Sequence, residues 1–419
     1  MTRRVVLHIG AMKTGTTYVQ QVLFEHRDVL HERGVLVPGR RWSDQVHAVQ
    51  DLLDMPDDDP AVTGRRGGSG LAGSWDALVS EVVASEDEVA VVSMEFLSFA
   101  TLPYAERAVA AFGDAEVRVV LTVRDAAAVA PAQWQTAVVS GGTDDWPTFQ
   151  RGVRRATGVV GKVLNRLQHD EARETFLRAQ LVPRILETWA GAAGVGALRV
   201  VTMPPPGSPR GLLWERFCRA AGIDGRGCER ADRANESLGY ASTELLRRVN
   251  LALDLSSQTE HNKTVKDHLA QRALASRSGE ERARLDPDTA AAAMGFNEVT
   301  RAAVATAGLE VVGDLGDLPV HAEDATAPID PRQEPPGPEE LLAAARTAYP
   351  VMVALCRRRA GRIADRGGRP RLKRRLQALG GPDSWTPDGD GVDRAVDELA
   401  ALCEIAVDLR RRLRKRTGS

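Results

Sequence analysis

The residues with the most evident chemical role lie in the segment GAMKTGTT, at positions 10–17. Gly10 and Gly15 allow several backbone N–H groups to converge on one point. Lys13 adds a full positive charge, and the helical pattern that follows directs the positive end of its dipole toward the same point. Three further donors are the hydroxyl groups of Thr14, Thr16 and Thr17. This pattern predicts a binding loop for an anion of the size of a phosphate.

The order of these residues differs from that of the nucleoside-triphosphate loop. In the pattern GxxxxGK[ST] the lysine follows the second glycine, and the next hydroxyl holds a magnesium ion. Here Lys13 precedes Gly15, in the order KTGTT. This order disfavours a metal-assisted kinase or ATPase, and we expect no metal site. The structural alternative is a tight turn between a strand and a helix in which the lysine is incidental.

The segment GAMKTGTTY, at positions 10–18, resembles the 5′-phosphosulfate-binding loop of sulfotransferases that use 3′-phosphoadenosine 5′-phosphosulfate (PAPS). In that family the loop reads PKSGTT or PKTGTT, so Met12 stands where proline is usual. The resemblance covers residues 1–320 and is closest to bacterial members of the actinomycete type. It implies that the phosphosulfate is bound by Gly10, Lys13, Thr14, Gly15, Thr16 and Thr17.

The resemblance also implies a P-loop-like α/β fold and a reaction. PAPS is the co-substrate, and its sulfuryl group passes without a metal to a hydroxyl, or less often an amine, of a carbohydrate, glycolipid or secondary metabolite. Two alternatives stay open: a degenerate member that binds a nucleotide without catalysis, and a nucleotide or small-molecule kinase. The sequence contains no motif that identifies the acceptor.

A second candidate anchor is Arg124, which follows the β-branched run EVRVVLTV at positions 116–123. The carboxyl end of a strand is where open α/β sheets bind ligands, and a planar guanidinium suits a phosphate. In the family that the loop resembles, this arginine binds the 3′-phosphate. The alternative is an ion pair with Asp125 or a neighbour that caps the next helix.

The same family carries a serine eight residues after the arginine, and here that position is Ala132. Gln133 or Gln135 is the candidate replacement donor, and we favour Gln133. The loss of one neutral hydrogen bond costs about 0.5–1.5 kcal/mol, so nucleotide binding is expected to weaken rather than vanish.

The candidate base is Glu95, which follows the strand pattern at positions 88–93. Parallel strands end at one edge of a sheet, so Glu95 is expected at the same edge as Lys13. Removal of the acceptor's proton is worth about 10²–10⁴ in rate, and related enzymes carry a histidine or a glutamate at this strand end. Lys13 and Glu95 are therefore the predicted catalytic residues. His47 is the rival base, and His8 is interpreted as a satisfied residue of the core or of a pocket wall.

The elements that must position these residues alternate between short β-branched runs and helical patterns. Such alternation predicts an α/β fold with a parallel sheet flanked by helices. We expect strands at 3–9, 88–93, 116–123, 197–203 and near 309–318, and helices at 16–33, 74–84, 126–139, from 211, 239–255 and 261–275.

The chain is expected to divide into a sulfotransferase-like domain at 1–320, a Pro-rich linker at 321–340 and a basic helical extension at 341–419. The extension carries 18 basic and 9 acidic residues, whereas the whole chain has a net charge of −2. We interpret the extension as an arginine-rich face that docks on the acidic remainder rather than as a nucleic-acid binder. Four aromatic side chains either line an acceptor site or belong to the core, namely Trp42, Trp75, Trp134 and Trp146.

The composition of the chain narrows the classes of protein to which it can belong. The 419 residues are 43% hydrophobic and 27% charged, which is typical of a globular protein. The four cysteines form no CxxC pair, so a disulfide framework and a zinc ribbon are disfavoured. We expect no transmembrane segment, no signal peptide and a cytoplasmic location. The oligomeric state is not predicted.

Overall fold

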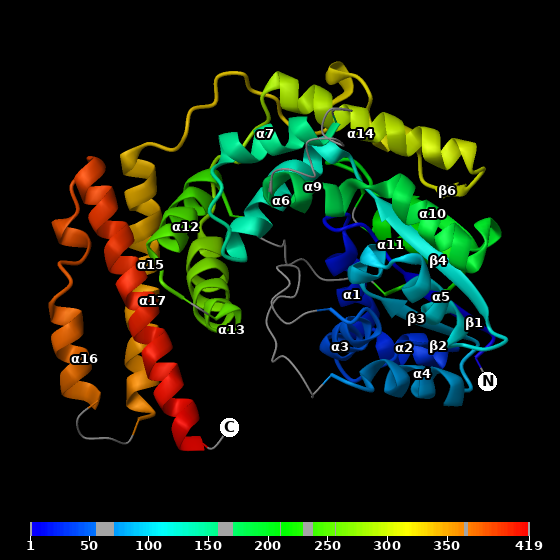
Figure 1. The fold of residues 1–419 in the computed structure, drawn as a ribbon, viewed down its shortest axis with the longest axis horizontal. Helices are drawn as coiled ribbons and strands as arrows, with labels where there is room; N and C mark the ends of the chain where they lie inside the picture. The colour runs from blue at the N-terminus through cyan, green and yellow to red at the C-terminus, as the bar shows by residue number, and fades with distance from the viewer. Residues whose placement is uncertain are drawn as a thin grey trace.

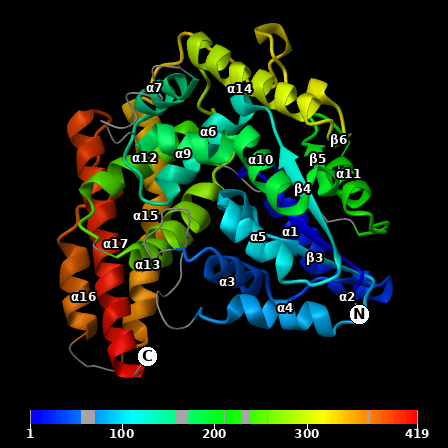
Figure 2. The same ribbon diagram turned by 45° about the vertical axis from the view of Figure 1, so that its right-hand side comes forward.

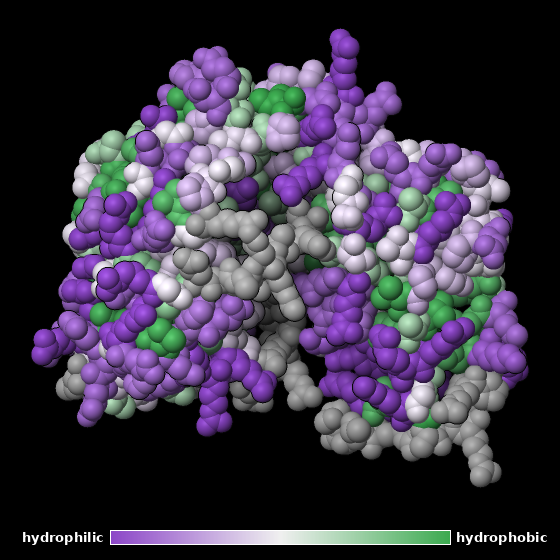
Figure 3. Space-filling view, turned by 180° about the vertical axis from the view of Figure 1, so that it is seen from behind, coloured by the Kyte–Doolittle hydropathy of each residue, from purple (hydrophilic) through white to green (hydrophobic). Residues whose placement is uncertain are grey.

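Figure 1 shows the computed structural model of the chain, which describes residues 2–55, 71–157, 171–209, 211–228, 238–255, 257–363 and 368–417. A parallel β-sheet with its covering helices occupies one side, and a half built mainly of helices occupies the other (Figures 1 and 2). Seen from behind, the surface is mostly hydrophilic and is hollowed between the two halves (Figure 3). These features confirm the predicted fold class.

The sheet has six strands in the order β2-β3-β1-β4-β5-β6, and all its neighbours are parallel. The strands are β1 (Arg4–His8), β2 (Val35–Leu36), β3 (Val89–Ser93), β4 (Glu116–Val123), β5 (Leu198–Thr202) and β6 (Glu310–Val312). Side chains of β1 alternate between two cores, with Val5 and Leu7 in one and Val6 in the other. A sheet buried on both faces therefore explains the continuous apolar runs in the sequence.

Helices cover both faces of the sheet. One face packs against α1 (Thr16–Glu25), α2 (Arg27–Glu32) and α11 (Leu212–Ala221). The other packs against α3 (Trp42–Leu52), α4 (Ser74–Ala84), α5 (Leu102–Ala110), α10 (Val182–Ala193) and the end of α14 (Pro287–Thr306). Short 3₁₀ segments are η1 (Glu95–Phe99), η2 (Val195–Ala197), η4 (Leu274–Ser276), η5 (Leu315–Asp317), η6 (Ala322–Asp324) and η7 (Pro382–Ser384).

Several details differ from the sequence-based expectation, among them helices α10 and α14, which were not predicted. The single helix expected at 16–33 is broken, because His26 takes φ −112° and ψ 20° and separates α1 from α2. Strand β2 was not predicted, since its two residues are too few to show a pattern, and its pairing with β3 alone defines it.

The helical half shares one hydrophobic core. Its elements are α6 (Ala126–Val139), α7 (Trp146–Thr157), α9 (Glu171–Gln180), α12 (Tyr240–Ala252), α13 (Gln258–His261), the π-helix η3 (Asn262–Ala273), α15 (Pro338–Gly361), α16 (Gly368–Gln377) and α17 (Gly389–Thr417). This core takes residues from both sides of the Pro-rich segment, for example Leu269 and Leu355. The proposed domain boundaries stay a prediction.

The Pro-rich segment at 321–340 contacts residues from the part of the chain that precedes it. Ile329 forms a parallel β-bridge with Leu285, and the Thr326 hydroxyl donates a hydrogen bond to Asp125 at the start of α6. The segment therefore runs along the structure before α15 begins.

The tryptophans divide between core and surface. Trp75, Trp134 and Trp146 are buried, and the rings of Trp134 and Trp146 lie 5.3 Å apart. Trp42 is 42% exposed. Three of the four are thus core residues, and Trp42 alone keeps the predicted role in an acceptor site.

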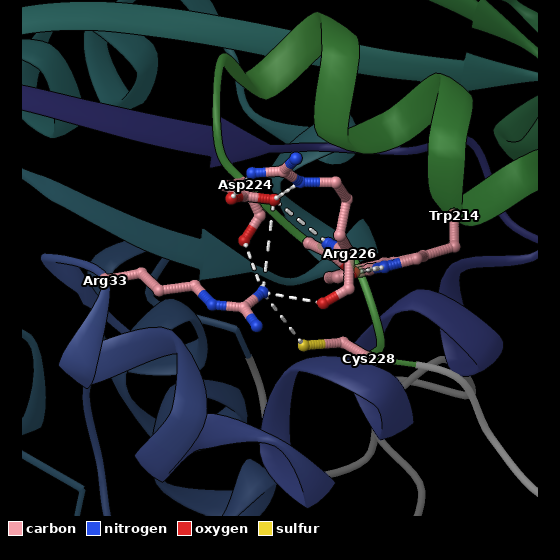
Figure 4. A network of polar contacts seen from close by, with 6 residues as sticks. Arg33, Trp214, Asp224, Arg226 and Cys228 are labelled. Carbon is pink, nitrogen blue, oxygen red and sulfur yellow. Dashed lines mark hydrogen bonds and ion pairs between the residues drawn. The ribbon is translucent and has the colours of Figure 1, made fainter.

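A polar network joins α2 to the segment after α11, on the face of the sheet that α1 and α11 cover (Figure 4). The Arg33 guanidinium donates to the carbonyl oxygens of Asp224 and Arg226 at 3.2 and 2.7 Å. Trp214 donates to the carbonyl of Gly225 at 2.9 Å.

All four cysteines are free thiols and buried. Within the described residues, no helix is long and apolar enough to cross a bilayer.

Candidate anion-binding site

The loop after β1 is held in an unusual backbone conformation. Lys13 has φ +66°, a left-handed value that costs energy in a residue with a side chain. Gly10 and Gly15 also have positive φ, and a Cβ at either would overlap neighbouring side chains, Thr16 at Gly10 and Leu213 at Gly15. Such strain is typical of functional loops.

Hydrogen bonds attach the loop at 10–17 to strand β4. The Ala11 amide donates to the carbonyl of Thr122 at 3.0 Å, and the buried Thr14 hydroxyl lies 2.6 Å from both the Ala11 carbonyl and the Thr122 hydroxyl. His8 continues this chain, with Nε2 3.3 Å from the Thr122 hydroxyl and Nδ1 2.7 Å from the Ser93 hydroxyl. The Thr14 hydroxyl therefore stabilises the loop through buried hydrogen bonds.

His8 is confirmed as a satisfied core residue. It is fully buried, and this burial lowers its pKa to about 3, so its ring is neutral at pH 7. Its role is to support the loop rather than to react.

The first turn of α1 presents a positive end toward the loop. Gly15 is the N-cap, no side chain among the described residues caps the helix, and its first turn carries no acidic residue. The helix dipole is therefore uncompensated there, as an anion site requires. Thr16 is buried beneath Gly10, whereas Thr17 is exposed on the first turn.

The structure brings the two predicted anchors together. Arg124 follows β4, and its Nη1 donates to the backbone carbonyl of Lys13 at 3.2 Å. Burial lowers the pKa of Arg124, the neighbouring Asp125 raises it, and the positive charge of Arg282 lowers it. The guanidinium thus lies partly buried at the end of the sheet, between the carboxylate of Asp125 and the positive charge of Arg282.

Asp125 has partners of its own. Its carboxylate accepts from the Ala127 amide at 3.0 Å and from the Asn297 amide at 2.8 Å, and it also accepts from the Thr326 hydroxyl. Asp125 is thus the N-cap of α6. The capping role that was the alternative for Arg124 belongs to its neighbour.

Glu95 lies at the same edge of the sheet as Lys13. It begins η1 directly after β3, the strand beside β1, and its carboxylate accepts from the Gln20 amide at 2.7 Å. Burial lowers the pKa of Lys13, the carboxylate of Glu95 raises it, and Arg124 lowers it. Lys13 is therefore within electrostatic reach of both the candidate base and the second anchor.

Gln20 is a site residue that the sequence did not single out. It is 2% exposed on α1, and its amide nitrogen also donates to the Ser93 carbonyl at 3.2 Å. A buried glutamine among the apolar positions of a helix was the available signal, because buried polar groups need specific partners. Its position fixes the orientation of Glu95.

The remaining predicted residues lie on helices. Gln133 is 3% exposed on α6, beside the partly buried Ala132. His47 is partly buried on α3. The nucleotide contact of Gln133 and the choice of Glu95 over His47 as the base stay predictions.

Two further cations enter from distant parts of the sequence. Lys266, on η3, is partly buried, and its pKa is lowered to about 8, first by burial and then by the positive charge of Lys13. On its own helix, Asp267 raises this pKa and Lys263 lowers it. Arg282 contributes its charge to Arg124 from the segment before α14. Neither was predicted, since an isolated basic residue in a helix or loop gives no local signal.

These charges make up the candidate anion site. Lys13 interacts with Arg124 and Lys266, and Arg124 also interacts with Arg282. Carboxylates act on the same cations, namely Glu95 on Lys13, Asp125 on Arg124 and Asp267 on Lys266. Like charges that lower one another's pKa values store repulsion, which a polyanion relieves when it binds. No cluster of three or more potential metal-ligating side chains occurs among the described residues.

The burial of Lys266, together with the positive charge of Lys13, predicts a pH-dependent stability. Its pKa is about 8 in the folded chain against an ordinary 10.5, so between these values the unfolded chain binds more protons and the free energy of unfolding rises with pH. We expect this rise, at most about 1.4 kcal/mol per pH unit, to be absent in Lys266→Gln. Urea unfolding of both proteins across this pH range measures the difference, and parallel curves would contradict it.

Comparison with known proteins adds one similarity. No protein-family model matches the chain, and no curated protein matches it. A crystal structure of a sulfotransferase from Alicyclobacillus acidocaldarius aligns with 66% of this chain and 100% of its own, at 15% sequence identity and a TM-score of 0.35. At this level of identity and superposition, the similarity says nothing about what the chain binds.

Proposed function

We propose that the chain is a PAPS-dependent sulfotransferase that acts on a hydroxyl, or less often an amine, of a carbohydrate, glycolipid or secondary metabolite. The observation that carries the proposal is the hydrogen bond from Arg124 to the Lys13 carbonyl, which joins the two predicted phosphate anchors. PAPS carries a phosphosulfate and a separate 3′-phosphate, and the site offers a cation for each. The hydrogen-bond donors of the site suit these two anionic groups of PAPS without a metal ion.

Each residue then has a distinct task. PAPS supplies the sulfuryl group, and 3′,5′-diphosphoadenosine leaves. Lys13 and the first turn of α1 stabilise the negative charge that grows on the leaving phosphate oxygen, which is a transition-state effect. Glu95, oriented by Gln20, takes the proton of the acceptor hydroxyl as the new S–O bond forms. Arg124 binds the 3′-phosphate and fixes the nucleotide.

The test is a thermal unfolding titration with 3′,5′-diphosphoadenosine in the presence of a chelator. A ligand that binds the folded chain raises its melting temperature by mass action, so we expect a metal-independent increase that Arg124→Met largely removes. Arg226→Met is the matched control, since its side chain is 90% exposed and pairs with Asp224 in a separate network.

Three results would favour another function or contradict the proposed one. Stabilisation by ATP with magnesium, and not by the diphosphoadenosine, favours a kinase. Tight binding of the diphosphoadenosine without transfer to any acceptor favours a degenerate, nucleotide-binding member, which the alanine at position 132 would suit. No stabilisation by either nucleotide would contradict the proposal.

A further inference from the structure

Four polar side chains from the loop and three neighbouring strands form one continuous series of hydrogen bonds. It contains Thr14 of the loop, Thr122 of β4, His8 of β1 and Ser93 of β3, and we call it the buried series. Each of these residues has an exposed fraction of 0%. Because the surrounding protein excludes bulk water, every polar atom of the series depends on its neighbours for a partner.

The direction of the series follows from its last acceptor. The Ala11 carbonyl can only accept, and it lies 2.6 Å from the Thr14 hydroxyl, so the single hydroxyl proton of Thr14 points at it. The 2.6 Å contact between Thr14 and Thr122 then requires Thr122 to donate. With its own proton used, the Thr122 oxygen accepts from Nε2 of His8 at 3.3 Å, and Nε2 must carry a proton.

The other nitrogen of His8 has the opposite role. Burial lowers the pKa of the ring to about 3, so at pH 7 it carries one proton, and Nδ1 is left as an acceptor. It lies 2.7 Å from the Ser93 hydroxyl, which therefore donates to it. The buried series thus runs in one direction, from Ser93 through the ring of His8 to the Ala11 carbonyl.

The end of the buried series at Ala11 lies directly against the backbone of the anion-binding loop. The Ala11 amide also donates to the Thr122 carbonyl at 3.0 Å. A Cβ at Gly10 would lie 2.8 Å from the Thr122 hydroxyl oxygen and 3.3 Å from Nε2 of His8. The position of the loop backbone therefore depends on where these two side chains lie.

The other end lies at the strand end that carries the candidate base. Ser93 is the last residue of β3, and its carbonyl accepts from the Gln20 amide at 3.2 Å. The same nitrogen of Gln20 donates to the Glu95 carboxylate at 2.7 Å. Between them, the Met94 amide donates to the backbone carbonyl of His8 at 3.1 Å. His8 therefore contacts the segment 93–95 through both its ring and its backbone.

We propose that His8 is a positioning residue for sulfuryl transfer, which, as its Nε2–H tautomer, fixes the anion-binding loop relative to the strand end that carries Glu95. The role in transfer rests on the proposed function, whereas the tautomer does not. His8 is fully buried and does not touch the nucleotide. Its task is to keep the sulfur held by the loop and the proton acceptor of Glu95 at a distance that suits one acceptor hydroxyl.

The first test is nitrogen NMR of the full chain with ¹⁵N-labelled histidine, which needs no activity. The resonances of His8 are those that disappear in His8→Gln. We expect a protonated Nε2 and an unprotonated Nδ1, and we expect Ser93→Ala to shift the Nδ1 resonance while Nε2 stays protonated. A proton on Nδ1 in the folded wild-type chain would reverse the buried series and overturn the proposal.

The second test compares transfer with binding in Thr122→Val, which keeps the size of the side chain but removes its hydroxyl. We expect the single-turnover rate to fall by roughly 10- to 100-fold, since a misplacement of about 1 Å costs about 10²-fold. The affinity for 3′,5′-diphosphoadenosine should fall by no more than about threefold, the loss of one neutral hydrogen bond. Thr122→Ser, which restores the hydroxyl, should recover most of the rate.

Thr243→Val is the matched control. Its hydroxyl is equally buried, but it donates to the Gly239 carbonyl at 2.8 Å within the helical half, so neither rate nor affinity should change. If Thr122→Val does not fold, Ser93→Ala breaks the other end of the buried series, and the same fall in rate with unchanged affinity is expected.

Two results would overturn the positioning role. A wild-type rate in folded Thr122→Val and Ser93→Ala, or equal losses of rate and affinity in both, would leave the proposed function standing without it. A wild-type chain that neither binds 3′,5′-diphosphoadenosine nor transfers a sulfuryl group would refute the proposed function and, with it, the role of His8 in transfer.

Discussion

Lys13→Ala is expected to slow sulfuryl transfer by on the order of 10³-fold while the chain stays folded. Loss of a single preorganised donor at a developing oxyanion costs about 10²–10³ in rate, and Lys13 contributes a full charge as well. The measurement is transfer of labelled sulfuryl groups from PAPS to a panel of sugar, phenol and amine acceptors, compared under single-turnover conditions.

The stability of the same variant is its control. The backbone of Lys13 is left-handed, and burial is the main reason why the pKa of its ammonium is lowered, with Glu95 raising this pKa and Arg124 lowering it. The net lowering means that the folded chain disfavours the charged form of Lys13. Lys13→Ala should therefore unfold at the same urea concentration as the wild type, or at a higher one. Near-wild-type transfer by a folded Lys13→Ala protein would contradict the assignment of the loop.

Glu95→Gln is expected to lower transfer by about 10²–10⁴-fold, the usual contribution of a positioned base. The amide keeps the size of the side chain but cannot take the acceptor's proton. Binding of 3′,5′-diphosphoadenosine should be unchanged or tighter, because a negative charge leaves the surroundings of Lys13. Parallel titration and transfer assays measure the two effects separately.

A matched variant tests the rival base. His47→Gln should leave the rate nearly unchanged if Glu95 removes the proton. Should Glu95→Gln retain its activity and His47→Gln lose it, the base lies on α3 and the proposed mechanism needs His47 in its place.

The sequence predicted those parts of the site that follow from local patterns. Arg124 follows β4 directly, Glu95 lies two residues after β3, and Lys13 lies in the loop that follows β1. Parallel strands bring their carboxyl ends together without further information. The strand at 116–123 and the helix at 126–139 were predicted with their observed bounds. The fold class followed from the same alternation.

The parts that were missed depend on contacts between distant segments. Lys266 interacts with Lys13, and Arg282 with Arg124, across separations in the sequence that no local pattern encodes. The role of Gln20 depends on its hydrogen bond to Glu95, which lies 75 residues later in the sequence. The break at His26 reflects one residue's dihedral angles, which no apolar pattern encodes.

The contacts of Arg359 and Arg411 with the segment 260–264 also bear on how the chain matures. Synthesis delivers residues from the N-terminus onward, and early segments start to fold before late ones emerge. The loop at 10–17 thus leaves the ribosome before the two arginines do. A chain interrupted before Arg359 would carry the loop without these contacts to the segment 260–264.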